Sequence, residues 1–155
     1  MESIAIDWGI VIRDFFRIML AFIFAIPIGW ERVRSPRNVG LRTFPIVATA
    51  SAGFVLIARS LPEIGPQGLA RVLQGLIAGI GFIGGGAILK QGLDVHGLAT
   101  AASVWNTGAI GAAVALDRFE IAIILALLNF GTLYFLTPVA NNFKDGSPSQ
   151  LEEGG

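Results

Sequence analysis

The residues best suited to chemistry in this chain are polar side chains set inside or beside long apolar segments. Glu31 and Arg32 end one such segment, and Arg42 and Thr43 begin the next. About a dozen residues join the two segments, so a turn between them can bring Glu31 near Arg42. An ion pair there would fix the turn and would contribute little if water reached it. The alternative is a functional role for these charges, and the spacing leaves both open.

A further charged residue lies inside the first apolar segment. Arg17 sits one turn within its boundary, on the same helical side as Ala21, Ala25 and Gly29. An arginine at membrane depth is costly unless it is paired or reaches the interface. Asp14, three positions earlier, is its nearest possible partner, and Arg17 is therefore a candidate functional residue.

Two amide side chains fall near the middles of later apolar segments. Asn106 and Asn129 could each hydrogen-bond a neighbouring helix for about 1 kcal/mol, or could together coordinate a cation. Mg²⁺ prefers carboxylates and retained water, and no carboxylate occurs inside the second to fifth apolar segments, which counts against a dehydrated divalent-ion site. Beside Asn106, a stripe of small hydroxyls follows one helical side: Thr100, Ser103 and Thr107.

Catalytic and cofactor-binding patterns are missing from the sequence. It has no cysteine and one histidine, His96, which with Asp94 nearby is typical of a loop residue. It contains no Ser/His/Asp set, no phosphate-binding P-loop and no metal-ligand cluster. The net charge of zero gives no indication of nucleic-acid binding. We therefore expect no enzymatic activity, no cofactor, no bound metal and no nucleic-acid partner.

The elements that position these residues are predicted by the distribution of apolar side chains. Of 155 residues, 54% are hydrophobic and only 14% charged, against about a quarter charged in soluble domains. Apolar runs approach the ~20 residues that a membrane-spanning helix needs and do not alternate as barrel strands would. We predict an all-α membrane bundle of about five transmembrane helices in one domain, 1–140, with a disordered polar tail, 141–155. The predicted spans are 15–30, 44–58, 72–89, 98–116 and 121–139.

Orientation is predicted from the first loop. This loop contains four arginines: Arg32, Arg34, Arg37 and Arg42. Basic residues concentrate on the cytoplasmic side of membrane proteins. We therefore expect the N-terminus outside the cell and the C-terminal tail inside.

The third span contains an unusual glycine run, "GLIAGIGFIGGGAILKQG". On a helical wheel the bulky residues, including Leu76 and Ile80, share one side, and the small ones occupy the other. We expect the small side to press against another backbone, in the bundle or in a dimer, and the bulky side to meet lipid. The alternative is that Gly84, Gly85 and Gly86 break the helix and leave carbonyls free to line a cavity or ion path. The small side holds Gly75, Ala78, Gly79, Gly81, Gly85 and Gly86.

Three blocks of sequence, in order, resemble the N-terminal membrane domain of the MgtC/SapB family: "GWERVRSPRNVGLRTFPIVATASAGF", the glycine run, and "VHGLATAASVWNTGAIGAA". The resemblance implies a multi-pass protein of the bacterial inner membrane. Family members are associated with growth at low magnesium and, in pathogens, with survival inside host cells, but the family is not established as a magnesium transporter. MgtC-type members continue into a soluble domain, and we expect this chain to be similar to the short SapB-type members instead. The resemblance places the family's recurrent positions at Gly29, Glu31, Arg32, Gly40, Leu41, Arg42, Thr43, Gly79, Gly81, Phe82, Gly84, Gly86, Gly97, Leu98, Thr100, Ala101, Ala102 and Trp105.

Two functions are compatible with these observations. The first is a non-enzymatic membrane regulator linked to magnesium or envelope homeostasis, which acts through helix–helix contacts with a second copy or another membrane protein in the bilayer. The second is an oligomeric small transporter or channel for an ion or small solute. Its path would be lined by Gly84 to Gly86, Thr100, Ser103 and Asn106.

Overall fold

Long helices make up most of the described chain. The computed structural model describes residues 7–33, 41–91 and 94–138, so the predictions for Arg34, Arg37, Gly40 and the tail lie outside these residues. Its elements are α1 (Trp8–Val33), α2 (Thr43–Ser60), α3 (Pro66–Gly85), β1 (Leu89–Gln91), β2 (Asp94–His96), α4 (Leu98–Ala115), α5 (Phe119–Gly131) and the π-helical turn η1 (Thr132–Leu136). The predicted all-α bundle is confirmed.

Four of these helices are long and apolar enough to cross a membrane: α2, α3, α4, and α5 continued by η1. Each contains a window of 18 residues with high hydropathy and few charges. The 26 residues of α1 would also be long enough, but charged residues flank its apolar middle, with Arg13, Asp14 and Arg17 on one side and Glu31 and Arg32 on the other. The chain is thus a membrane protein with transmembrane helices.

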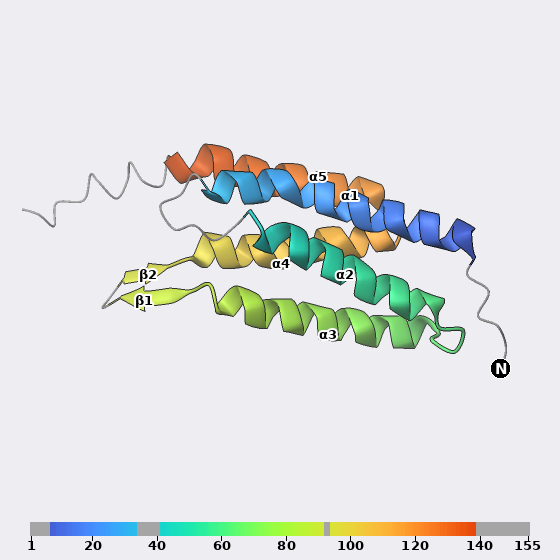
Figure 1. The fold of residues 1–155 in the computed structure, drawn as a ribbon. Coiled ribbons are helices and arrows are strands. Elements are labelled where there is room, and N and C mark those ends of the chain that lie inside the picture. Colours follow the sequence, from blue (N-terminus) through green and yellow to red (C-terminus); the bar gives the residue numbers. More distant parts are fainter. Residues whose placement is uncertain (1–6, 34–40, 92–93, 139–155) are drawn as a thin grey trace, which may run out of the picture.

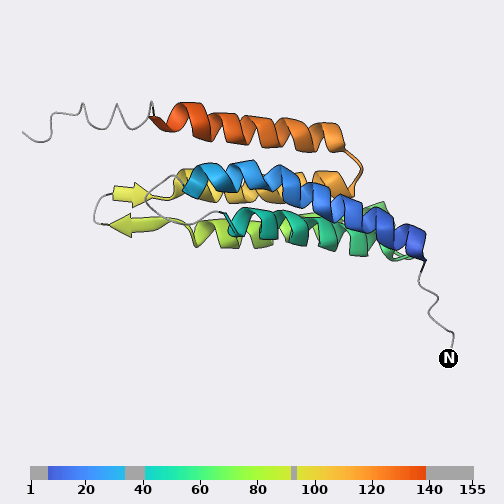
Figure 2. The ribbon, with the colours of Figure 1, turned by 45° about the horizontal axis from the view of Figure 1, so that its top comes forward.

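Successive helices run in opposite directions, and α4 lies at the centre (Figure 1). It packs against α1, α2, α3 and α5. Figure 2 shows α5 at the outer edge of the bundle, whereas α3 lies on the opposite side of α4 in Figure 1. Helices α3 and α5 therefore lie on different sides of the central helix α4.

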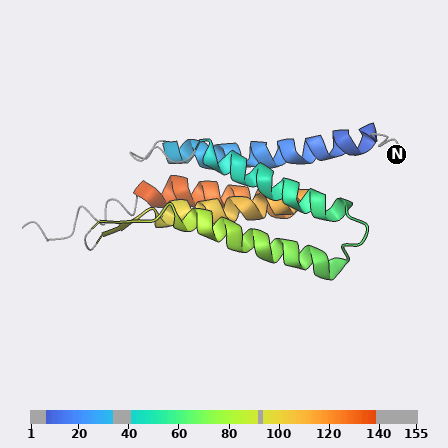
Figure 3. The same ribbon diagram turned by 60° about the horizontal axis from the view of Figure 1, so that its bottom comes forward.

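The bundle has two ends, which we name by their features. At the hairpin end α1 finishes, α2 begins, α3 finishes and α4 begins, and the antiparallel hairpin β1–β2 extends beyond them (Figure 3). At the opposite end, the Asp117 end, α2 finishes and α4 turns into α5. The hairpin differs from the loop that we predicted for this segment.

The small residues that share one helical side in the first and fourth spans face the interior of the bundle. Ala21 and Ala25 of α1 are fully buried, as are Ser103, Thr107 and Gly111 of α4. A Cβ added at Gly111 would overlap the carbonyl oxygen of Ala48 in α2 and lie 2.9 Å from its carbonyl carbon. The backbones of α2 and α4 are therefore in direct contact.

The corresponding prediction for the third span is wrong within the chain. Gly75, Gly79, Gly81 and Gly85 are exposed, and a Cβ added at any of them would meet no atom within 4 Å. Part of the broad side faces inward instead: Ile80 is only 5% exposed and is pressed onto Gly108 of α4, whereas Ile77 and Ile83 are exposed. Near the end of α3, the buried Gly84 approaches the backbone of α4, because a Cβ there would lie 3.0 Å from the carbonyl oxygen of Ala101. Helix α3 therefore contacts α4 through Ile80 and Gly84, and Gly75, Gly79, Gly81 and Gly85 face away from this contact.

The glycines at 84–86 end α3 and do not interrupt it. The predicted span 72–89 is shifted along the chain, because α3 begins at Pro66 and finishes at Gly85. The carbonyls of Gly84 and Gly85 accept hydrogen bonds from the backbone N–H groups of Ala87 and Ile88, at 3.0 and 3.1 Å. These two carbonyls are thus occupied by the turn that leads into β1, contrary to the expectation of free carbonyls.

Candidate functional site

The hairpin end brings a buried arginine to the start of α4. The last turn of α1 carries Arg32, and the first turn of α4 carries Thr100. Arg32 Nη1 donates a hydrogen bond to Thr100 Oγ1 at 3.1 Å. The Arg32 side chain belongs to a residue that is only 8% exposed, and its buried Nε has no hydrogen-bond partner. Among the described residues, the buried guanidinium is therefore held by the neutral Thr100 hydroxyl, with the opposite charge of Glu31 nearby.

The start of α4 is fixed by a glycine. Gly97 has φ +88°, a left-handed conformation that an L side chain rarely adopts. A Cβ there would also overlap the carbonyl oxygen of Ala87, so the chain end of α3 lies directly against this turn. No side chain caps α4 at Gly97. The first backbone N–H groups of a helix lack partners within the helix, so the start of α4 beside Arg32 has donors that no described side chain caps.

Two other residues predicted at this end lie at the start of α2. Arg42 is exposed and directly precedes α2, whose first residue is the half-buried Thr43. A Glu31–Arg42 ion pair stays a prediction. Arg32 and Thr100 were both candidates from the sequence, but their spacing did not pair them. The available signal was that the end of the first span and the start of the fourth lie on the same side of the membrane.

A second polar group lies between α4 and α5. Ser103 Oγ donates to Asn129 Oδ1 at 2.9 Å, and Asn106 Nδ2 donates to the carbonyl oxygen of Leu125 at 3.2 Å. Thr107 Oγ1 turns back to the Ser103 carbonyl oxygen at 2.7 Å. Both asparagines thus bond the neighbouring helix, as the packing interpretation expected. An open groove of about 330 Å³ runs beside them.

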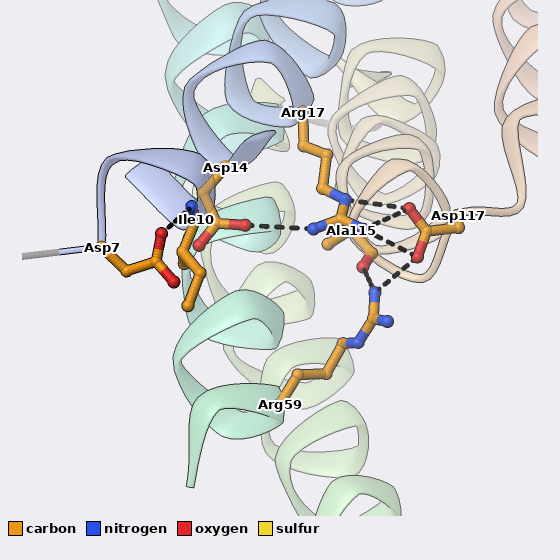
Figure 4. A network of polar contacts seen from close by, with 7 residues as sticks. All are labelled: Asp7, Ile10, Asp14, Arg17, Arg59, Ala115 and Asp117. Carbon is orange, nitrogen blue, oxygen red and sulfur yellow. Dashed lines mark hydrogen bonds and ion pairs between the residues drawn. The ribbon is translucent and has the colours of Figure 1, made fainter. Parts of the chain in front are cut away.

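The Asp117 end holds a network of charges that joins three parts of the fold (Figure 4). Arg17 of α1 donates from Nε to Asp117 Oδ1 at 2.8 Å and from Nη2 to Oδ2 at 2.9 Å. Arg59 at the end of α2 donates to Asp117 Oδ2 at 2.9 Å and also to the carbonyl oxygen of Ala115. The predicted Asp14 partner of Arg17 is confirmed at 3.1 Å.

Asp117 itself was missed by the sequence analysis. It lies in the turn between α4 and α5, with φ 60°, one hundred positions from Arg17, and no local spacing connects the two. Burial raises the pKa of its carboxyl, but hydrogen bonds and charge from Arg17 and Arg59 outweigh burial and hold the pKa below its ordinary value. The carboxylate therefore stays ionised and clamps α1, α2 and the α4–α5 turn together.

The surface of the bundle has an open apolar groove of about 480 Å³ between α2 and α3. Gly75 and Gly79 line it together with Ala50, Phe54 and Ile83. Within residues 7–33, 41–91 and 94–138, no three His, Cys, Asp or Glu side chains lie together as a possible metal site.

Comparison with known proteins gives consistent matches over most of the chain. The MgtC family matches residues 18–142. The chain is 36% identical over 132 residues to "Protein SrpB" of Synechococcus elongatus, covering 76% of this chain and 71% of that protein. It is 35% identical over 111 residues to "Protein MgtC" of Salmonella typhimurium, covering 72% of this chain and 47% of that protein.

A third relative carries a functional name. The chain is 33% identical over 131 residues to "Putative magnesium transporter YhiD" of Escherichia coli, covering 78% of this chain and 60% of that protein. The matched segment thus spans about half the length of the Salmonella relative and somewhat more of the Escherichia coli one. No solved structure matches the chain.

Proposed function

The chain belongs to the MgtC family, and from this membership we propose that it is a non-enzymatic regulator linked to magnesium or envelope homeostasis. It resides in the bacterial inner membrane and acts through helix–helix contacts with a second copy or with another membrane protein. The Escherichia coli relative whose name refers to magnesium transport supports the connection to magnesium.

One observation carries the contact mechanism: the small side of α3 is unused within the chain. Gly75 and Gly79 are exposed and line the groove between α2 and α3, with open space where a Cβ would stand. Glycine weakens a helix and offers no side chain for packing, so an exposed row of it contributes nothing to this bundle by itself. Small residues spaced by four are typical of surfaces where two transmembrane helices approach closely.

Enlarging this surface tests the proposal. Gly79→Leu fills open space, so we expect the chain to insert and fold normally while association is lost. The measurement is crosslinking in the native membrane, followed by mass spectrometry of the products. The matched control is Gly131→Leu in α5, where an added Cβ also meets nothing within 4 Å. Unchanged crosslinked products in Gly79→Leu would contradict the contact mechanism.

A transporter or channel is the second candidate, and three polar side chains in the mainly apolar groove beside α5 favour it. Ser103, Asn106 and Asn129 line this groove at membrane depth, and a relative is named for magnesium transport. Several copies would have to surround a shared path. Purified protein in liposomes should then pass Mg²⁺ or another small ion, and Asn106→Leu should reduce the flux. Liposomes that stay tight to all common ions would exclude this candidate.

We also propose that the hairpin end faces the cytoplasm. Because the chain has no cysteine, single cysteines can report orientation without background. A cysteine at Lys90 in β1 should be protected from a membrane-impermeant maleimide in intact cells, and one at Gln67 near the start of α3 should be labelled. The reverse pattern would place the N-terminus inside.

A further inference from the structure

We propose that the hairpin end contains a binding site for a phosphate-type oxyanion, formed by the guanidinium of Arg32 and the first turn of α4. The site is separate from the exposed side of α3. Its evidence is the unfulfilled bonding of a buried cation at the positive end of a helix.

The first step is the state of Arg32. A guanidinium carries five N–H donors and no acceptor, and a buried charge is costly unless it is paired and hydrogen-bonded. Arg32 is more than nine-tenths buried, yet its bond within the described part of the chain goes to the uncharged Thr100 hydroxyl, and Nε has no acceptor. Glu31 attracts Arg32 through space without satisfying Nε. A buried donor is therefore left over.

The second step is where this cation lies. Thr100 stands in the first turn of the 18-residue helix α4, so the bond from Arg32 Nη1 fixes the guanidinium at the helix N-terminus. That end carries a partial positive charge of roughly half an elementary unit, and no side chain caps it. The fold thus gathers two positive groups, and within the described ranges both have donors without an acceptor. An anion between them would relieve the repulsion and accept the spare N–H groups.

The third step is the chemistry of the anion. The edge of a guanidinium formed by Nε and a terminal nitrogen matches two oxygens of a planar or tetrahedral oxyanion. Thr100 accepts a bond from Arg32, so its own hydroxyl proton can be donated to a further oxygen. Three donor types at one helix start, namely a guanidinium, a hydroxyl and backbone N–H groups, favour a phosphate group. At a membrane surface that phosphate belongs either to a lipid headgroup or to a free phosphate compound.

Binding to the full-length protein in maltoside micelles, which contain no phosphate, tests the site. One arm titrates inorganic phosphate against a matched chloride series, and the other titrates dispersed phosphatidic acid in phosphate-free buffer. The readout is the thermal unfolding midpoint. A rise with inorganic phosphate identifies a free phosphate as the ligand, whereas a rise with phosphatidic acid alone identifies a lipid headgroup.

Variants connect the response to the proposed donors. Thr100→Val keeps the shape of the side chain and removes the hydroxyl, and Arg32→Lys keeps the charge and removes the forked donor edge. Each should weaken the apparent affinity roughly tenfold, the usual effect of losing a hydrogen bond to a charged group. Arg13→Gln, which alters an exposed arginine of α1, should leave it unchanged. Should Arg32→Lys fail to fold, Thr100→Val still decides. No midpoint rise in either arm, or equal affinity in Thr100→Val, would overturn the site.

Discussion

The contact between α2 and α4 gives the sharpest quantitative prediction. A Cβ added at Gly111 would overlap the carbonyl oxygen of Ala48 and lie 2.9 Å from its carbonyl carbon and 3.0 Å from the Ser51 Cβ. Carbon atoms pack best at about 3.5–4.0 Å and the carbonyl oxygen lies closer to the new Cβ than either carbon, so Gly111→Ala must push the helices apart by roughly 1 Å. Such overpacking costs about 1–3 kcal/mol. The loss falls on the centre of the core, since α4 contacts all the other helices.

The assay is unfolding in mixed micelles with increasing dodecyl sulfate, followed by circular dichroism. Gly53→Ala in α2 is the control, because a Cβ there meets nothing within 4 Å. Both substitutions replace glycine by alanine in a helix, so their effects on helix propensity cancel in the comparison. We expect Gly111→Ala to unfold at a clearly lower dodecyl sulfate fraction than Gly53→Ala. Equal midpoints for the two variants would refute the close approach of α2 and α4.

Three further predictions concern other contacts. Asp117→Asn removes an ion-pair partner shared by Arg17 and Arg59, and should lower stability by about 0.5–1 kcal/mol, because solvent screens this partly exposed group. Because the pKa of Asp117 is depressed in the folded state, its stabilising contribution is complete above the ordinary carboxyl pKa and is lost as the pH falls through the folded pKa. The unfolding midpoint of the unsubstituted chain should therefore fall as the pH is lowered from about 6 to about 2, and this pH dependence should be smaller in Asp117→Asn. Ser103→Ala breaks the bond to Asn129 and should cost about 0.6 kcal/mol in the same titration. Gly97→Ala forces a strained φ and an overlap with Ala87, so it should greatly reduce the yield of folded protein in size-exclusion profiles, whereas Gly81→Ala should not.

The helices could be predicted because membrane-spanning segments leave a strong signal in the sequence. Apolar runs of about 20 residues are longer than the apolar segments of helices in a soluble core, and they indicate membrane-spanning helices. The positions of α2 and α4 match the predicted spans closely. The inward stripe of Ser103 and Thr107 was also readable, since small and hydroxyl residues repeat at helical spacing. The β1–β2 hairpin could not be predicted from the sequence, because strands of three residues are too short to show an alternating pattern.

The orientation of α3 and the charge network required the tertiary fold. A helical wheel separates large from small residues but does not say which side meets the bundle. That depended on Gly108, a residue of another helix, which receives Ile80. In the same way, Arg17 and Asp117 meet only because α1 lies beside the turn after α4. Neither partner has a local sequence feature that names the other.

The peripheral position of α3 has a consequence for the order in which the bundle loosens. Among the described residues, neither a side-chain hydrogen bond nor an ion pair reaches α3, so apolar contact with α2 and α4 alone retains it. Lipid tails compete well with such contact, because burial away from water supplies no extra drive inside a bilayer. By contrast, the ion pairs of Asp117 with Arg17 and Arg59 connect α1 and α2 to the turn after α4. We therefore expect helix α3 to separate from the bundle first. It could then exchange its contacts with α2 and α4 for contacts with another helix, while α1, α2, α4 and α5 stay packed together.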